Sequence, residues 1–181
     1  MKKTFILFAT LLSTLALISF KPIDKWIKVE TANCKIYFPQ KPTGKSEIVN
    51  TAKGDLKINI FLYQATPAKN DDNLAYILSE TEYPDSVMNS EKKDRLEAFF
   101  KNSIDGVVQR FNGTLIEQTV TTLNGYPGRQ VKLGIQGGKA VMNIRFYLVK
   151  NRMFVLQTIT QSGKEDNTSI EKFMDSFEIN E

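Results

Sequence analysis

The sequence predicts an α+β domain: an antiparallel sheet of about six to eight strands with a long helix on one face and a short C-terminal helix on the other, an α/β/α sandwich. Three observations lead to this fold class. They are segments of alternating polar and apolar residues, one long stretch with helical spacing, and a short amphipathic segment near the C-terminus. With 181 residues and 41% hydrophobic content, the chain can bury one core of ordinary size.

The first twenty residues have the pattern of a secretory leader, with Lys2 and Lys3 before an uncharged apolar run. This run is shorter than the roughly 20 apolar residues that a membrane span needs. We therefore divide the chain into a signal peptide at residues 1–20 and a single domain at residues 21–181. We expect an exported, periplasmic or secreted bacterial protein, with an uncleaved N-terminal membrane anchor as the alternative.

Alternating residues predict strands before and after a central helical segment, at 26–30, 34–38, 46–52, 55–64, 74–83, 114–122 and 129–135. For residues 74–83 a helical turn is the alternative to a strand. Cys34 shares its strand face with Ile36 and Phe38, so we interpret it as a small buried apolar side chain rather than a reactive thiol. Because it is the single cysteine, no intrachain disulfide can form.

Residues 90–112 are the clearest predicted helix, with Ser90 as N-terminal cap and Gly113 at the position of a left-handed C-terminal cap. Apolar residues recur along it at intervals of three and four. The members of this stripe are Leu96, Phe99, Phe100, Ile104, Val107, Val108 and Phe111. Each such side chain contributes roughly 1.5–3 kcal/mol when buried, which outweighs the cost of about 1 kcal/mol for Gly106 inside the helix. This helix should therefore lie on the sheet.

The stretch at residues 124–160 predicts three consecutive antiparallel strands. If Lys150 and Asn151 form a two-residue hairpin loop, Val149 pairs with Arg152 and the register of the last two strands follows. One face of this hairpin then consists almost entirely of apolar residues: Met142, Ile144, Phe146, Leu148, Met153, Val155 and Ile159. The other face is mixed and gathers Tyr147, Phe154 and Leu156. We expect the apolar face to take the long helix and the mixed face to be partly covered.

Residues 168–177 predict a short helix that begins with a capping box from Thr168 to Glu171. Its inner stripe is Ile170, Phe173, Met174 and Phe177. A short amphipathic helix at this place is the natural cover for the mixed face of the sheet.

Four short segments resemble the PsbP-like superfamily: IYFPQKP at 36–42, LNGYPGRQ at 123–130, FYLVKNRMFVLQ at 146–157 and FMDSFEI at 173–179. This superfamily of small exported or organelle-lumen domains includes the photosystem protein PsbP, periplasmic proteins similar to DcrB, and the nuclear factor that binds the GTPase Ran. The resemblance implies an antiparallel sheet with helices on both faces. It also implies a role in binding or assisting other proteins, and it transfers no functional residue.

The chain contains no histidine, which removes the commonest general base and the commonest transition-metal ligand. Mechanisms of the Ser-His-Asp and Cys-His types therefore cannot be built within one chain. Gly125, Gly128 and Gly134 form no phosphate-binding loop, because strand-like sequence follows them. We expect no catalytic residue, no metal and no cofactor. A net charge of only +4 argues against nucleic acid as a partner.

Six residues make up the candidate partner surface: Tyr126, Arg129, Arg145, Tyr147, Lys150 and Arg152. The first two lie in the tight connection before a strand, the next two on the mixed face, and the last two at the hairpin tip. The alternative interpretation is structural: turn geometry, a helix-covered face, and a charged tip that prevents edge association.

From these observations we predict an exported, non-enzymatic accessory domain that acts through an unknown envelope protein, as a monomer or weak dimer. We leave open whether the domain lies close to a membrane. The alternative is a carrier of a small apolar or lipid ligand, held beneath Phe99, Phe100 and Phe111. A third hypothesis is a carboxylate-dependent hydrolase, although the 20 Asp and Glu residues show no supporting spacing.

Overall fold

The computed structural model describes residues 25–51, 54–66 and 71–180, so the predicted leader lies outside the described residues. The elements in chain order are β1 (Ile27–Glu30), β2 (Cys34–Phe38), β3 (Thr43–Thr51), β4 (Gly54–Gln64), β5 (Asn73–Glu82), α1 (Lys93–Phe111), β6 (Thr114–Leu123), β7 (Tyr126–Ile135), the 3-10 turn η2 (Gln136–Gly138), β8 (Ala140–Val149), β9 (Arg152–Gln161), α2 (Thr168–Asp175) and β10 (Glu178–Ile179). The predicted α+β class is confirmed, and the segment 74–83 is a strand, as preferred from its alternation, except that the strand ends at Glu82.

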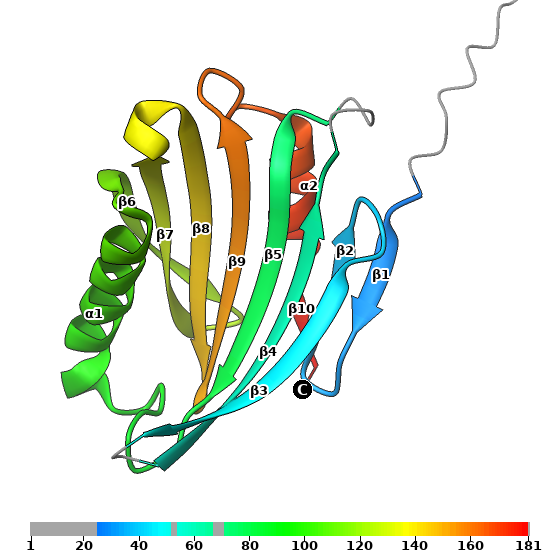
Figure 1. The fold of residues 1–181 in the computed structure, drawn as a ribbon. Helices are drawn as coiled ribbons and strands as arrows, with labels where there is room; N and C mark the ends of the chain where they lie inside the picture. The colour runs from blue at the N-terminus through cyan, green and yellow to red at the C-terminus, as the bar shows by residue number, and fades with distance from the viewer. Residues whose placement is uncertain (1–24, 52–53, 67–70, 181) are drawn as a thin grey trace, which may run out of the picture.

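Two antiparallel sheets are present in the described part of the chain (Figure 1). The large one has seven strands in the order β3-β4-β5-β9-β8-β7-β6, and the small one has three in the order β1-β2-β10. The sequence predicted one sheet, so the small sheet is a correction. It arises because β10 pairs with β2, where Ile179 lies opposite Cys34, a contact between segments far apart in the chain.

The β8–β9 hairpin has the predicted register. Val149 pairs with Arg152, and Leu148 pairs with Met153. Lys150 opens the two-residue loop with a φ of 53°, the left-handed conformation that matches the twist of tight hairpins. The apolar face of this hairpin packs with the stripe of α1 in one buried cluster, as predicted.

Helix α1 is shorter at its start than predicted. Ser90 precedes the helix, and its backbone N–H donates to the carbonyl of Lys150 at 2.8 Å instead of leaving Ser90 to cap it. At the other end Asn112, not Gly113, adopts the left-handed cap conformation, with φ of 46°. Asparagine tolerates this conformation because its short polar side chain bonds locally.

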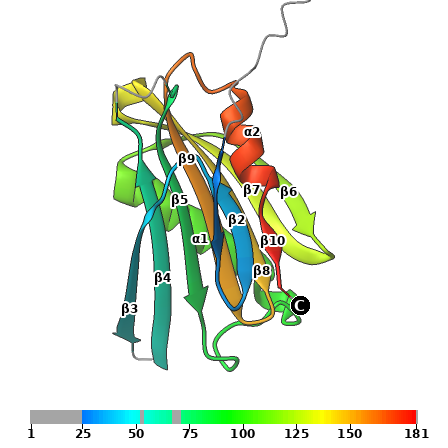
Figure 2. The ribbon, with the colours of Figure 1, turned by 90° about the vertical axis from the view of Figure 1, so that its right-hand side faces the viewer.

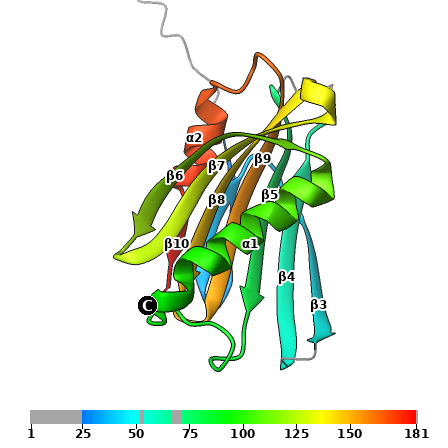
Figure 3. The ribbon, with the colours of Figure 1, turned by 90° about the vertical axis from the view of Figure 1, so that its left-hand side faces the viewer.

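The opposite face of the large sheet carries α2 together with the small sheet. Figures 2 and 3 show α1 and α2 on different sides of the seven strands. Phe173 of α2 is fully buried, with its ring 5.1 Å from that of Phe38 and 5.3 Å from that of Tyr76. Asn167, rather than the predicted Thr168, caps α2 by accepting a hydrogen bond from the N–H of Ile170.

Candidate functional site

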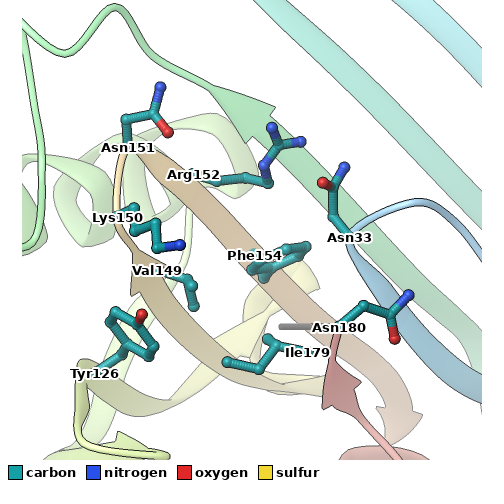
Figure 4. Close-up of a pocket in the computed structure, with 9 residues that line it drawn as sticks. All are labelled: Asn33, Tyr126, Val149, Lys150, Asn151, Arg152, Phe154, Ile179 and Asn180. Carbon is teal, nitrogen blue, oxygen red and sulfur yellow. The ribbon is translucent and has the colours of Figure 1, made fainter.

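A groove lies on the mixed face of the large sheet, beside the loop of the β8–β9 hairpin, and we call it the hairpin groove. Its volume is about 530 Å³. Figure 4 shows the side chains that line it: Asn33, Tyr126, Val149, Lys150, Asn151, Arg152, Phe154, Ile179 and Asn180. The groove thus forms where the small sheet stops covering the large one.

The hairpin groove has an apolar floor and a polar rim. Phe154 lies in the middle, on β9, with Tyr126 and Lys150 on one side and Asn33 and Asn180 on the other (Figure 4). The rim draws on elements far apart in the sequence, because Asn33 precedes β2 and Asn180 follows β10. The backbone N–H of Asn180 donates to the carbonyl of Asn33 at 2.9 Å, which fixes that side of the rim.

Lys150 supplies the exposed charge of the hairpin groove. Its position in the two-residue loop holds the start of its side chain at the rim, and Figure 4 shows the ammonium group directed toward the middle of the groove. Among the described residues, no carboxylate forms an ion pair with this ammonium group. The charge is therefore available to an anionic group that enters from solvent.

Arg152 lines the wall of the groove, but its charge is already paired with carboxylates of the same chain. Its Nη1 donates to Oε1 of Glu80, a carboxylate that is only 1% exposed, and its Nη2 lies 3.4 Å from Glu82. The side-chain amide of Asn33 donates to the same Oε1. A buried carboxylate needs such partners, because an ion removed from water without them costs several kcal/mol.

Of the six predicted surface residues, the structure brings Tyr126, Lys150 and Arg152 together in this groove. Arg129 lies elsewhere, and its placement is a correction. It is 4% exposed on the α1 face, where its guanidinium carbon lies 4.6 Å from the centre of the Phe100 ring. The reason is local: the turn is formed by the two residues before Tyr126, so Arg129 falls inside β7 and alternation directs it toward α1.

Arg145 and Tyr147 hold α2 in place and do not line the groove. Arg145 forms a 2.6 Å ion pair with Asp175, and the ring of Tyr147, nearly buried, is stacked parallel to that of Phe177 at 6.1 Å. Gly128 leaves room for the neighbouring strand and for this ring, since a Cβ there would lie 2.6 Å from the Phe146 carbonyl oxygen and 2.7 Å from the Tyr147 ring. Arg145 and Tyr147 therefore fit the alternative interpretation of the sequence, in which they lie on a helix-covered face and have a structural role.

Sequence reasoning missed the amide residues of the rim and the buried Glu80. The amide residues come together only through the small sheet, which the sequence did not predict. Glu80 did leave a signal: it alternates with Tyr76 and Leu78, so it is an acid at a core position of a strand. An acidic side chain at such a position requires a partner, and Arg152 on the neighbouring strand provides it.

Cys34 is buried, as predicted from its alternation with Ile36 and Phe38. Burial raises the pKa of the thiol from 9.0 to about 11, against a smaller opposing effect of the Thr31 hydroxyl. The thiol is therefore protonated at neutral pH, and only the thiolate is an effective nucleophile. Cys34 acts as a core side chain.

In residues 25–51, 54–66 and 71–180, no three side chains of the types His, Cys, Asp and Glu gather as a metal site would require. Within the same residues, no helix combines the length and the apolar character needed to cross a membrane.

Comparisons with known proteins give distant likenesses only. No family model and no curated protein matches the chain. The solution structure of cyanobacterial PsbP from Synechocystis is similar at a TM-score of 0.47 and 9% identity, covering 92% of this chain and 99% of that one. A crystal structure of a protein of unknown function from Pseudomonas aeruginosa is similar at 0.40 and 11% identity, covering 66% and 85%. At these scores neither likeness assigns a function, and membership of the PsbP-like superfamily stays a prediction.

Proposed function

We propose that this chain is an exported, non-catalytic accessory domain that holds a short segment of a partner protein in the hairpin groove. One observation carries the proposal: an apolar floor around Phe154 is bordered by side-chain amides and by the ammonium group of Lys150, which forms no ion pair with any residue that the structure describes. Such a groove complements a segment that carries one apolar side chain beside one carboxylate. The apolar side chain would be buried against Val149 and Ile179, which are partly exposed beside the buried ring of Phe154, and the carboxylate would pair with Lys150.

The size of the groove favours weak, reversible binding. A pocket of about 530 Å³ accepts only a few side chains, whereas a stable complex involves roughly 20–30 residues on each side. A single exposed ion pair adds only about 0–1 kcal/mol, so burial of the apolar side chain must supply most of the affinity. Lys150 would then select partners by charge and contribute a salt-dependent part of the binding.

Two residues near the groove support a binding role over a catalytic one. Glu80 is held by Arg152 and Asn33, so it is poorly placed to take a proton from a substrate. Cys34 is a buried, protonated thiol. For the carboxylate-dependent hydrolase, we find no supporting arrangement around the groove.

The carrier hypothesis needs a cavity beneath Phe99, Phe100 and Phe111, and the contacts there run against it. The rings of Phe99 and Phe100 are 6.0 Å apart, and the Phe100 ring takes the Arg129 guanidinium against its face. Phe100 is 1% exposed within the packed cluster between α1 and the sheet. These side chains fill the space that a ligand would need.

The proposal includes two further inferences. The leader pattern at residues 1–20 supports export, so the partner would be an envelope or secreted protein. The two helices and the sheet between them would form the α/β/α sandwich expected from the sequence, with the small sheet as part of one outer layer.

The test is binding of the purified protein to an array of immobilised peptides that vary one acidic and one apolar position. We expect retention by peptides that carry both, and loss of retention in Lys150→Glu. The matched control is Lys139→Glu, which makes the same charge change at the opposite end of β8 and should bind like wild type. Equal retention by both variants, or retention that ignores the acidic position, would rule the proposal out.

A further inference from the structure

A second cavity lies over the middle of β3, the first half of β4 and the end of β5, and we call it the carboxylate cavity. It also has a volume of about 530 Å³, and it shares Asn33 and Arg152 with the hairpin groove. Its other lining residues include Ser46, Asn59 and Glu80. The Glu80–Arg152 pair therefore stands between the two cavities.

Glu80 presents one satisfied and one unsatisfied oxygen to this cavity. Oε1 accepts hydrogen bonds from Asn33 and Arg152. Oε2 is buried and has no hydrogen-bond partner among the described residues. Because Glu80 is 1% exposed, bulk water does not solvate this oxygen, and an unpaired buried acceptor costs about 1–3 kcal/mol, more when it is charged.

Most of the charged side chains around the carboxylate cavity already have partners. Three carboxylates line it, those of Glu47, Glu80 and Glu82, against the two bases Lys57 and Arg152. Arg152 is engaged by both Glu80 and Glu82. Lys57 lies opposite Glu82 in the strand register and is exposed, so it does not reach the buried oxygen of Glu80 as a partner. Glu47 is paired with Lys45, so the unmet need of this cavity is the hydrogen bond at Oε2 of Glu80, which a donor from outside would supply.

We infer that the carboxylate cavity binds an organic cation with N–H donors, an alkylammonium or guanidinium group, which donates a hydrogen bond to Oε2 of Glu80. A charged donor suits this site best, because the oxygen without a hydrogen bond belongs to a carboxylate. Ammonium and guanidinium groups combine the two, and charge-assisted hydrogen bonds are about twice as strong as neutral ones. This site is separate from the binding of a partner's carboxylate at Lys150.

The probes are arginine methyl ester and n-butylamine, titrated into the full chain and followed by the amide NMR signals of Asn33, Asn59 and Glu80. A blocked pentapeptide with one central arginine is a third arm, and tighter binding of the peptide than of the ester identifies a partner side chain as the source of the cation. Tetramethylammonium is the control, because it has the same charge and no N–H group. We expect saturable shifts with the three donors and none with tetramethylammonium.

Glu80→Gln should weaken binding of these donors at least tenfold, because the amide keeps the shape of the side chain and removes its charge. Glu47→Gln is the matched control, since it removes the same charge at the rim from a residue whose carboxylate already pairs with Lys45. Equal binding of tetramethylammonium, no saturable shift with any donor, or unchanged binding in Glu80→Gln would overturn the inference.

A second variant guards against poor folding of Glu80→Gln. Asn59 lies directly opposite Glu80 on β4, and residues so paired have Cβ atoms about 4.5–5.5 Å apart. Asn59→Lys would bring an internal ammonium group to the same oxygen, at the cost of one exposed hydrogen bond from Ser46. We expect a higher unfolding temperature and loss of n-butylamine binding. A lower unfolding temperature, or binding that persists in this variant, would contradict the site.

Discussion

Arg129 offers the sharpest test of how α1 is held on the sheet. Its charge is paired with Glu97, yet Arg129 is 4% exposed while the Glu97 side chain is 84% exposed. The two partners should therefore contribute very unequally. The three methylenes of the Arg129 stem contribute about 2.4 kcal/mol by burial, at about 0.8 kcal/mol each. Contact of the guanidinium with the Phe100 ring adds about 1 kcal/mol.

Alanine keeps Cβ, so Arg129→Ala removes two of these methylenes, about 1.6 kcal/mol, and with the ring contact we expect it to lower the free energy of unfolding by about 2.6 kcal/mol. Arg129→Met keeps most of the stem and should cost about 1 kcal/mol, the contact with the ring. Glu97→Gln should cost less than about 1 kcal/mol, because the carboxylate is solvated. Urea denaturation followed by circular dichroism measures all three. If Glu97→Gln destabilised the protein as much as Arg129→Ala, the ion pair and not the packing would hold this contact, and the reasoning would fail.

Three further predictions concern the other face of the sheet. Phe173→Ala should lower the free energy of unfolding by about 3–5 kcal/mol in urea denaturation, since the ring is fully buried; a loss below about 1 kcal/mol would mean that α2 is not docked. Gly128→Ala should cost about 1–3 kcal/mol by the same assay and disturb Tyr147, whereas Gly125→Ala, where a Cβ meets no neighbour, should show only the strain of its positive φ and leave Tyr147 in place. Stability should fall as pH rises from 9.0 through about 11, because the unfolded thiol of Cys34 ionises while the raised pKa keeps the native thiol protonated. Burial also raises the pKa values of Tyr63, Tyr76 and Tyr83 above 10.0, so the decline continues at higher pH; Cys34→Ala should reduce its first part, between pH 9.0 and 10.0, and an unchanged slope there would contradict the role of the thiol.

The periodicity of apolar residues was sufficient to predict the register of one hairpin and the buried face of the long helix. The register of β8 and β9 followed from one assumption about Lys150 and Asn151, because a slip of one residue would have turned the apolar face to solvent. The stripe of α1 identified the helix and the face it covers for the same reason. Cap positions were less accurate, since Asn112 and Asn167 compete with neighbouring residues for the same role.

Only some residues of the hairpin groove could be predicted from the sequence. Lys150 and Arg152 were found because they flank a hairpin tip whose register was already known. Asn33 and Asn180 meet through the β2–β10 pairing, and no local pattern specifies pairing between segments so far apart in the chain. Arg129 was placed in the turn because the predicted turn was too long. Its alternation with Val131 already indicated that the Arg129 side chain lies on the face covered by α1.

Contact at the hairpin groove in living cells is the most direct test of the proposed function. A photo-reactive phenylalanine analogue at Tyr126 would stand in the groove, and the same analogue at Val120 would stand on the exposed edge strand β6, where the native side chain is 74% exposed. We expect one discrete protein adduct from position 126, lost when Lys150→Glu is added, and none from position 120. Equal adducts at both positions, or an adduct at 126 that survives Lys150→Glu, would contradict a partner held by this groove.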